Sequence, residues 1–339
     1  MRAAVDVMGG DKAPQEILKG CWEAAPLLDG EDRIILIGDE AVIKPALEAA
    51  TLTADQKARY QVVHTTQIIG MDDPPVEAVR SKPDSSIAVM CKLASKKEAD
   101  VVISAGNTGA CVAASQLRMR TLPGISRPGI ATVVPTPSGP IILCDVGANV
   151  TPKAKHLLQY AIMAGAYAEA VLGKTNPKIG LLSVGEEDAK GNPVVKQTVK
   201  MLREEPLINF IGNVEGRDLT RGTADVIITD GFVGNVILKL MEGVTHGLFE
   251  QLIGEVIANA PQVVDQLKPT MKKIIASYDW QEYGGAPLLG VDGYSIICHG
   301  RSEAKAIMNA IRVGKQLVKS NLNRRITDKI EQSIPVSEE

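Results

Sequence analysis

One pattern recurs along the whole chain: a short run of β-branched residues, then a polar turn containing glycine, then a segment with helical spacing. Short, uniformly apolar runs are typical of strands that are buried on both faces. Strands that alternate with helices predict a mainly parallel sheet between two layers of helices. In such sheets ligands bind beyond the carboxyl ends of the strands, and the polar turns lie at those ends.

The stretch 101–119 shows the pattern most clearly, with three β-branched residues, a polar turn and a helix of small residues. The turn reads Ser104-Ala105-Gly106-Asn107-Thr108-Gly109. The N–H groups and dipole of a helix start favour an anion, and glycine lets the backbone approach it closely. The alternative is an ordinary strand-to-helix turn in which Asn107 or Thr108 caps the helix.

A similar turn follows the first expected strand and reads Asp6-Val7-Met8-Gly9-Gly10-Asp11, with Pro14 near the first helical position. Its glycines lack the spacing of a dinucleotide-binding turn, so the sequence does not indicate a nicotinamide cofactor. Further along, Arg80 precedes the residues Asp84-Ser85-Ser86. This combination suits either an anionic ligand or ordinary helix capping beside surface charge.

More polar turns follow strands in the rest of the chain. Strands expected at 130–135 and 140–145 are joined by Thr136-Pro137-Ser138-Gly139, which predicts an antiparallel hairpin inside the parallel pattern. About ten strands in all predict one large mixed sheet, and no linker marks a clean domain boundary. The further turns are Asp145-Val146-Gly147-Ala148-Asn149, Gly185 to Asn192, Gly212 to Asp218, Asp230 to Asn235, and His299-Gly300-Arg301-Ser302.

Composition argues against several classes of protein. The net charge is −3 and aromatic residues make up 3% of the chain, which gives no sign of nucleic-acid binding. The five cysteines show no paired spacing and suit buried thiols in a reducing cytoplasm. The first residues lack the pattern of a signal peptide, and the most apolar helix, 157–172, is too short to span a bilayer. We therefore expect a cytoplasmic protein.

Taken together, the turns resemble those of the acyl-carrier-protein:phosphate acyltransferase (PlsX) family of bacterial phospholipid synthesis. The resemblance implies a fold similar to that of the isocitrate and isopropylmalate dehydrogenases and of phosphotransacetylase. That fold is a three-layer α/β/α arrangement with one large mixed, mainly parallel sheet and two intertwined subdomains. The resemblance runs from Met1 to about Leu317 through Asp6 to Asp11, Asp84 to Ser86, Ser104 to Ala110, Asp145 to Asn149, Gly185 to Asn192, Gly212 to Asp218, Thr229 to Val236, and His299-Gly300.

On this basis we expect one catalytic unit with a cleft between its subdomains. One subdomain would comprise about residues 1–145 plus 293–339, and the other about residues 146–292. The implied reaction moves a fatty acyl group from acyl-acyl-carrier-protein (acyl-ACP) to inorganic phosphate, giving acyl phosphate. The resemblance also implies a homodimer and a reaction without a metal or organic cofactor.

Phosphate is already nucleophilic near neutral pH, so such a site must position it, stabilise the thioester oxyanion and exclude water. We expect Asn107 to donate a hydrogen bond to phosphate or to the oxyanion. Lys190 and His299 are the candidates for donating a proton to the departing thiolate. The alternative for each Asn or Asp is that it caps a helix. For His299 the alternative is a structural histidine, and for Lys190 it is a solvated lysine. The expected substrate-binding residues are Asp6, Gly9, Gly10, Asp11, Arg80, Ser85, Ser86, Ser104, Gly106, Thr108, Gly109, Arg127, Asp145, Asn149, Glu187, Asn213, Asp230 and Asn235.

Three other functions are compatible with parts of the sequence. A phosphotransacetylase would perform the same chemistry on acyl-CoA. A dehydrogenase of the related fold would need a cluster of metal-binding aspartates; Asp225 and Asp230 flank one strand, but capping explains them better. A non-catalytic scaffold would have no need for so many polar glycine turns.

Residues 233–278 form two amphipathic segments. Apolar residues recur at three- and four-residue spacing up to Val256, Ala260-Pro261 interrupts the pattern, and Lys268, Lys272 and Lys273 lie among the apolar residues of the second segment. We expect a helical hairpin that projects from the sheet and packs against the same hairpin of a second subunit, because alone it would expose much apolar surface. Its tip suits an anionic membrane, where a glycerol-3-phosphate acyltransferase would take up acyl phosphate. The alternative is dimer core with solvated lysines.

Overall fold

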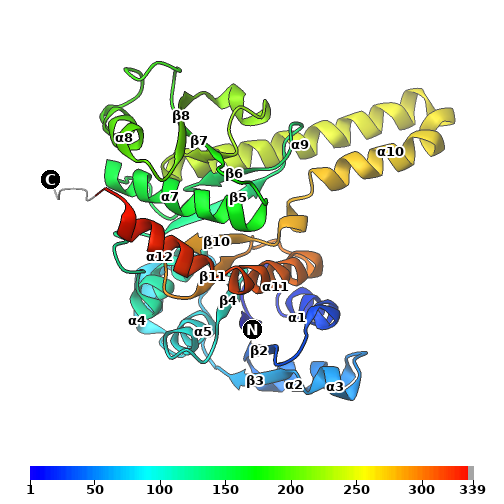
Figure 1. Cartoon of the computed structure of the whole chain (residues 1–339). Helices are drawn as coiled ribbons and strands as arrows, with labels where there is room; N and C mark the ends of the chain where they lie inside the picture. Colours follow the sequence, from blue (N-terminus) through cyan, green and yellow to red (C-terminus); the bar gives the residue numbers. More distant parts are fainter. Residues whose placement is uncertain (335–339) are drawn as a thin grey trace.

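The structure, a computed structural model, describes residues 1–334 and is drawn in Figure 1. Its strands are β1 (Arg2–Asp6), β2 (Arg33–Gly38), β3 (Tyr60–His64), β4 (Val101–Ser104), β5 (Gly129–Val134), β6 (Ile141–Cys144), β7 (Lys178–Leu182), β8 (Asn209–Val214), β9 (Val226–Ile228), β10 (Ala286–Leu289) and β11 (Tyr294–Ile297). Its α-helices are α1 (Gln15–Glu23), α2 (Glu40–Ala49), α3 (Ala54–Lys57), α4 (Pro75–Ser81), α5 (Ser86–Ser95), α6 (Thr108–Ala114), α7 (Ala154–Val171), α8 (Pro193–Glu204), α9 (Gly231–Asn259), α10 (Val264–Ser277), α11 (Ala304–Lys319) and α12 (Leu322–Gln332).

All the strands belong to one sheet, in the order β3-β2-β1-β4-β11-β10-β5-β6-β9-β7-β8. β1, β2, β3, β4 and β11 are parallel to one another. β10 is antiparallel to β11 and β5, and β5 forms the expected antiparallel hairpin with β6. β6, β9, β7 and β8 are again mutually parallel. Three antiparallel pairings separate β6 from β11, so the two halves of the sheet run in opposite directions. Their carboxyl ends therefore lie at opposite edges.

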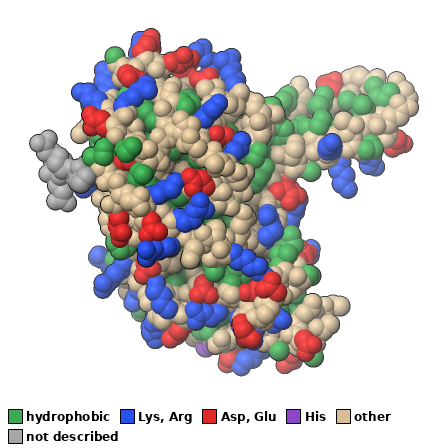
Figure 2. Space-filling view, in the orientation of Figure 1, with side chains coloured by type: hydrophobic (Ala, Val, Ile, Leu, Met, Phe, Trp, Pro, Cys, Tyr) green, Lys and Arg blue, Asp and Glu red, His purple; other side chains and the backbone are tan. Residues whose placement is uncertain are grey.

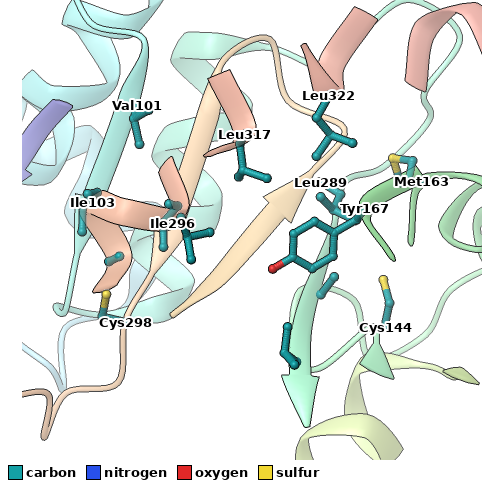
Figure 3. Packing of buried hydrophobic residues seen from close by; sticks show 14 of the residues in the cluster. Val101, Ile103, Cys144, Met163, Tyr167, Leu289, Ile296, Cys298, Leu317 and Leu322 are labelled. Atoms are coloured by element: carbon teal, nitrogen blue, oxygen red, sulfur yellow. The ribbon is translucent and has the colours of Figure 1, made fainter. Parts of the chain in front are cut away.

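Helices cover both faces of this sheet. On one face α1, α7, α11 and α12 contribute to a large apolar cluster, part of which is shown in Figure 3. There Val101 and Ile296 of the strands lie near Leu317 and Leu322 of the covering helices, and Tyr167 of α7 points into the same region. On the other face a second cluster includes residues of α4, α5 and α6. This arrangement confirms the fold class expected from the sequence.

Two features differ from the sequence expectation. β10 was not anticipated because its sequence, Ala-Pro-Leu-Leu, is short and contains proline, which is rare in central strands. The helix expected at the end of the stretch 101–119 begins at Thr108. Its α-helical part ends at Ala114, and a π-helical turn follows over Ser115–Met119.

α9 and α10 form the projecting hairpin that the sequence predicts, at the right of Figure 1. An edge-to-face contact between Phe249 and Tyr278, with ring centroids 5.8 Å apart, holds the two arms together. Figure 2 shows apolar side chains along the hairpin and Lys or Arg side chains on its lower side. Within residues 1–334, no helix has the length and apolarity needed to cross a bilayer.

Candidate functional site

Three polar turns meet at one edge of the sheet, because β1, β4 and β11 are adjacent parallel strands. The amide of Asp11 donates to the carbonyl of Gly300 at 2.8 Å, which joins the turns after β1 and β11. Gly9 lies so close to the turn after β4 that an added Cβ would be 2.9 Å from the nitrogen of Gly106. Gly10 has a φ of +105°, which favours glycine. The three turns therefore form one continuous backbone surface.

A buried carboxylate, Asp6, lies behind these turns. It accepts hydrogen bonds from the hydroxyl of Ser104 at 2.7 Å and from the amide of Met8 at 3.1 Å. Burial raises the pKa of Asp6, and hydrogen bonds from Ser86 and Ser104 partly oppose that rise. Ser85 is also buried and caps α5. These aspartate and serine side chains shape the turns from inside, and their expected contact with substrate stays a prediction.

The side chain of Asn107 is fully engaged. Its oxygen accepts from the amide of Ala110 at 3.0 Å, so Asn107 is the cap of α6. Its nitrogen donates to the carbonyls of Gly70, Met71 and Asp73 at 3.2, 3.0 and 3.0 Å. Asn107 thus fastens the loop 70–73 beside the turn after β4. Donation to phosphate or to an oxyanion would compete with these bonds, and that role stays a prediction.

The start of α6 and the neighbouring α4 border the same surface. The first amides of a helix have no partner within the helix, and those of Thr108 and Gly109 lie before the capped amide of α6. Thr108 is exposed, and Pro75 at the start of α4 packs closely on Gly109. Arg80 is exposed in the last turn of α4. This edge therefore combines amide donors with a cation on the helix that packs against α6.

His299, in the turn after β11, is half-buried at the base of the projecting hairpin. Its Nε2 lies 2.6 Å from the Nζ of Lys239 on α9, and its Nδ1 accepts from the amide of Arg301 at 3.1 Å. The ring of Trp280 lies 5.8 Å away between centroids. Burial lowers the pKa of His299, and the charges of Lys239 and Arg301 lower it further. The ring is therefore biased toward its neutral form.

A second group of turns lies at the opposite edge, after β6 and β9. Asp145, the residue after β6, is buried, and burial raises its pKa while hydrogen bonds from backbone amides oppose the rise. Its carboxylate accepts from the amides of Ile130, Gly147, Ala148 and Asn149 at 2.7 to 3.1 Å. Asp145 thus organises this turn as Asp6 organises the turns at the other edge.

Asn149 joins the turn after β6 to its surroundings. Its side-chain nitrogen donates to the carbonyl of Pro128 and to the hydroxyl of Tyr160, each at 2.7 Å, and its oxygen accepts from Arg127 at 3.3 Å. Asp230 caps α9, as the capping alternative predicted, and Asn235 is exposed in the helix that it opens. Arg127 is the exposed cation of this group.

The turn after β7 carries Lys190 and Glu187 on an exposed loop. The amide of Lys190 donates to the carbonyl of Glu187 at 2.9 Å, and the side chain of Asn213 donates to the same carbonyl at 2.9 Å. The side-chain oxygen of Asn213 is buried, and it has no hydrogen-bond partner within residues 1–334. The loop is thus held from β8, while the Lys190 side chain faces solvent.

α9 connects the two edges. It begins at Gly231, whose amide donates to the carbonyl of Asn149 at 2.8 Å. Lys239 comes eight residues later, about 12 Å along a helix with a rise of ~1.5 Å per residue, and contacts His299 at the other edge. The sequence analysis did not single out Lys239 or Trp280. The available signal was that Lys239 is the one Lys or Arg between residues 231 and 259.

Two common kinds of reactive centre find no support in the described part of the chain. Within residues 1–334, no group of three or more His, Cys, Asp or Glu side chains could hold a metal ion. The cysteines there are all buried, and burial raises the pKa of each thiol, to about 12 for Cys91 and Cys298. Buried thiols of this kind are poor nucleophiles.

Comparisons with known proteins give a consistent result. A family model described as "Fatty acid synthesis protein" matches residues 1–325. A phosphate acyltransferase of Desulfitobacterium hafniense is 48% identical over 329 residues, covering 96% of each chain. A phosphate acyltransferase of Dictyoglomus turgidum is 44% identical over 331 residues, covering 97% of each chain.

Solved structures share the fold at much lower identity. A phosphotransacetylase from Streptococcus pyogenes has a TM-score of 0.62 at 16% identity and covers 94% of each chain. A 4-hydroxythreonine-4-phosphate dehydrogenase from Klebsiella pneumoniae has a TM-score of 0.51 at 14% identity, covering 94% of this chain and 97% of its own. At such identities the likeness concerns the fold alone.

Proposed function

Because the chain belongs to the fatty acid synthesis protein family and is a phosphate acyltransferase, we propose that it transfers a fatty acyl group from acyl-ACP to inorganic phosphate. The products are ACP with a free thiol and acyl phosphate, a precursor for phosphatidic acid and other phospholipids. Since the protein is an enzyme, the scaffold alternative no longer applies. The carrier of the acyl group is the part of the proposal that goes beyond the family.

The contact between the turns after β1, β4 and β11 is the observation that carries the proposal. It supports a phosphate site in which the amides near Gly10, Thr108 and Gly109 donate to the anion. Arg301 lies in the turn after β11 and supplies positive charge nearby. Lys190, which we expected to steady phosphate or the departing thiolate, lies on the exposed loop after β7 in the opposite half of the sheet, and no contact joins its side chain to these three turns within residues 1–334.

The chemistry needs no covalent intermediate on the protein. An oxygen of monohydrogen phosphate attacks the thioester carbonyl, the bond from carbon to sulfur breaks, and the thiolate takes up the proton that phosphate loses. The buried cysteines favour this direct route over a thiol nucleophile. The protein then contributes orientation, donors for the oxyanion and a dry site.

A steady-state assay tests the acyl donor. Purified protein is given acyl-ACP or acyl-CoA of the same chain length, with and without phosphate, and the release of free thiol is followed. We expect release that depends on phosphate and a higher kcat/KM for acyl-ACP. A preference for acyl-CoA would identify the phosphotransacetylase alternative, and release that ignores phosphate would contradict the proposal.

The proposal includes a homodimer formed through the α9–α10 hairpin. Large apolar side chains form an exposed row along α9, and each of them is between 49% and 64% exposed. They are Phe232, Val236, Leu240, Val244, Leu248 and Leu252. Leu267, Ile274 and Ile275 of α10 are also exposed. A contiguous apolar surface of this kind on a projecting element supports a self-complementary contact between two copies.

The hairpin is also our candidate for contact with an anionic membrane surface, along its returning arm α10 rather than at the tip between the two arms. Lys268, Lys272 and Lys273 of α10 are exposed beside apolar residues, a combination that suits the headgroup region of a bilayer. Such a contact would place a cytoplasmic enzyme where a membrane glycerol-3-phosphate acyltransferase can take up its product.

A further inference from the structure

Exposed positive side chains gather where the end of α5 meets the π-helical turn η2 (Ser115–Met119) that follows α6. Within residues 1–334, no ion pair or side-chain hydrogen bond engages any of these cations. Residues 75–120 contain seven Lys and Arg against four Asp and Glu, although the whole chain has a net charge of −3. The four unpaired cations are Lys92, Lys96, Arg118 and Arg120.

The end of α5 and the turn η2 are joined beneath this surface. The Sγ of Cys91 on α5 lies 3.7 Å from the Oγ of Ser115 in η2. The carbonyl of Arg120 accepts from the amide of Asp292 at 3.1 Å, and the carboxylate of Asp292 pairs with Lys97 at 2.7 Å. Each of these contacts lies at or beside one of the four cations in the sequence. The cations therefore belong to one stretch of surface, which we call the α5–η2 patch.

The backbone of η2 adopts a costly conformation that brings an apolar residue to the surface. Arg120 has a φ of +66° and a ψ of 176°, a region that favours glycine, and its amide donates to the carbonyl of Ser115, five residues back, at 3.2 Å. Leu117 is 51% exposed, whereas Met119 is buried. Strained residues and π-helical turns are frequent at functional sites. This turn presents Leu117 and Arg118 together to a partner.

We propose that the α5–η2 patch docks the acyl carrier protein through an acidic face of the carrier, with Leu117 covered by the contact. This inference rests on the proposed function, in which ACP is the macromolecular substrate. Unpaired cations around an apolar side chain complement a partner of opposite charge, and they steer its approach.

The place of the patch in the fold suits a carrier that delivers its acyl group from a distance. η2 continues α6, and the first turn of α6 belongs to the three glycine turns. Thr108 and Leu117 are nine residues apart, about 14 Å at a rise of ~1.5 Å per residue. ACP carries its acyl group on a long flexible arm, so the carrier itself need not touch the glycine turns.

The same cations would also attract an anionic bilayer, but the patch offers little to hold one. Binding of a protein surface to a bilayer increases with the apolar area that enters it. Between residues 86 and 120, Leu117 is the one large apolar side chain that is exposed. A protein partner, whose charges can match the four cations individually, is therefore favoured over a membrane.

The test reverses single charges in the whole protein. The variants are Lys92→Glu and Arg118→Glu, with Lys19→Glu as the matched control on α1, which covers the other face of the sheet. Arg120 is left in place because its strained backbone would complicate any change there. Calorimetric titration gives the Kd for ACP without an acyl group. Steady-state assays then compare acyl-ACP with a small acyl thioester of the same chain length, which has no protein to dock.

In Lys92→Glu and in Arg118→Glu we expect the Kd for ACP and the KM for acyl-ACP to rise by about tenfold or more, with unchanged turnover of the small thioester. Added salt should weaken ACP binding more steeply in the unaltered protein than in either variant. Lys19→Glu should change none of these quantities.

An unchanged Kd for ACP in both variants, or an equal loss of activity with both acyl donors, would overturn the inference. Loss of binding to vesicles that contain phosphatidylglycerol, with the Kd for ACP unchanged, would identify the patch as a membrane contact instead. Failure of the unaltered protein to use acyl-ACP would refute the proposed function, whereas failure of the docking inference alone would leave acyl-ACP turnover intact and insensitive to the two substitutions.

Discussion

Asp6 and Asp145 perform the same task in the two halves of the sheet. Each follows or ends a central strand, is buried, and accepts amide hydrogens of the turn that comes next. Burial raises the pKa of both carboxyl groups. Each aspartate thus fixes the path of a glycine turn from behind, and the turn's outer surface is left for a ligand.

Replacing Asp6 by Asn should change how stability depends on pH. The ordinary pKa of this carboxyl group is 3.8 and its folded-state pKa is raised, so the stabilisation from protonated Asp6 is fully present below about pH 3.8. It is lost as pH rises through the folded-state pKa. Asn cannot lose a proton, so the free energy of unfolding of Asp6→Asn, relative to the unaltered protein, should increase as the pH rises above 3.8.

Urea unfolding at several pH values measures this difference, with Asp55→Asn on the exposed face of α3 as the control. The control should show no comparable rise. If the difference in unfolding free energy between Asp6→Asn and the unaltered protein is constant, or falls as pH rises, then the ionised carboxylate of Asp6 does not destabilise the folded protein.

Among the elements, the loop between β3 and α4 depends on a neighbouring helix cap. Asn107 holds three of its carbonyls through a single side-chain nitrogen and caps α6 through its oxygen. Met71 of this loop reaches the turn after β11, where its Cε lies 3.0 Å from the position of an added Cβ on Gly300. The loop therefore covers part of the edge at which the three glycine turns meet.

Asn107→Ala should release this loop as well as the cap. Loss of a cap costs about 1 kcal/mol, and the three freed carbonyls should then exchange their contacts for water. We expect faster hydrogen exchange over residues 70–75 and lower turnover. Asp39→Ala removes a similar cap, on α2, where the carboxylate accepts from Ala41 at 2.9 Å. It should lower stability by a similar amount and leave both the loop and turnover unchanged; unaltered exchange over the loop in Asn107→Ala would refute this account.

For the whole molecule, the sequence predicted the alternation of strands and helices, the β5–β6 hairpin and the projecting α9–α10 pair, because each has a local signature. It did not show β10, a short strand with a proline, which pairs antiparallel with both β11 and β5 and so leaves these two strands parallel. The reversal between the halves of the sheet then comes from the β5–β6 hairpin. The sequence also could not show which polar residues are buried beneath a turn and which lie on its exposed surface. Asp6 and Thr108 are both polar residues at strand ends, yet only Thr108 is exposed. The contact between Lys239 and His299 joins residues 60 positions apart.

The proposed dimer can be tested at the exposed apolar side chains of α9. Leu248 is 62% exposed, and a carboxylate there would have to be buried at the proposed contact between hairpins. Leu248→Asp should convert the dimer into a monomer in sedimentation equilibrium, without loss of helical content by circular dichroism. Val42→Asp, at an apolar position of α2 that is 38% exposed, is the control and should remain dimeric. A Leu248→Asp dimer of unchanged stability would place the contact elsewhere.

The central claim is that phosphate, held by the turns after β1, β4 and β11, attacks the thioester directly. The most direct measurement mixes a stoichiometric amount of the protein with acyl-ACP, without phosphate, and follows free ACP thiol on the millisecond to second scale. We predict no burst of thiol until phosphate is added, and then release at the steady-state rate. A burst that approaches one thiol per active site in the absence of phosphate would reveal an acyl-protein intermediate and contradict the account.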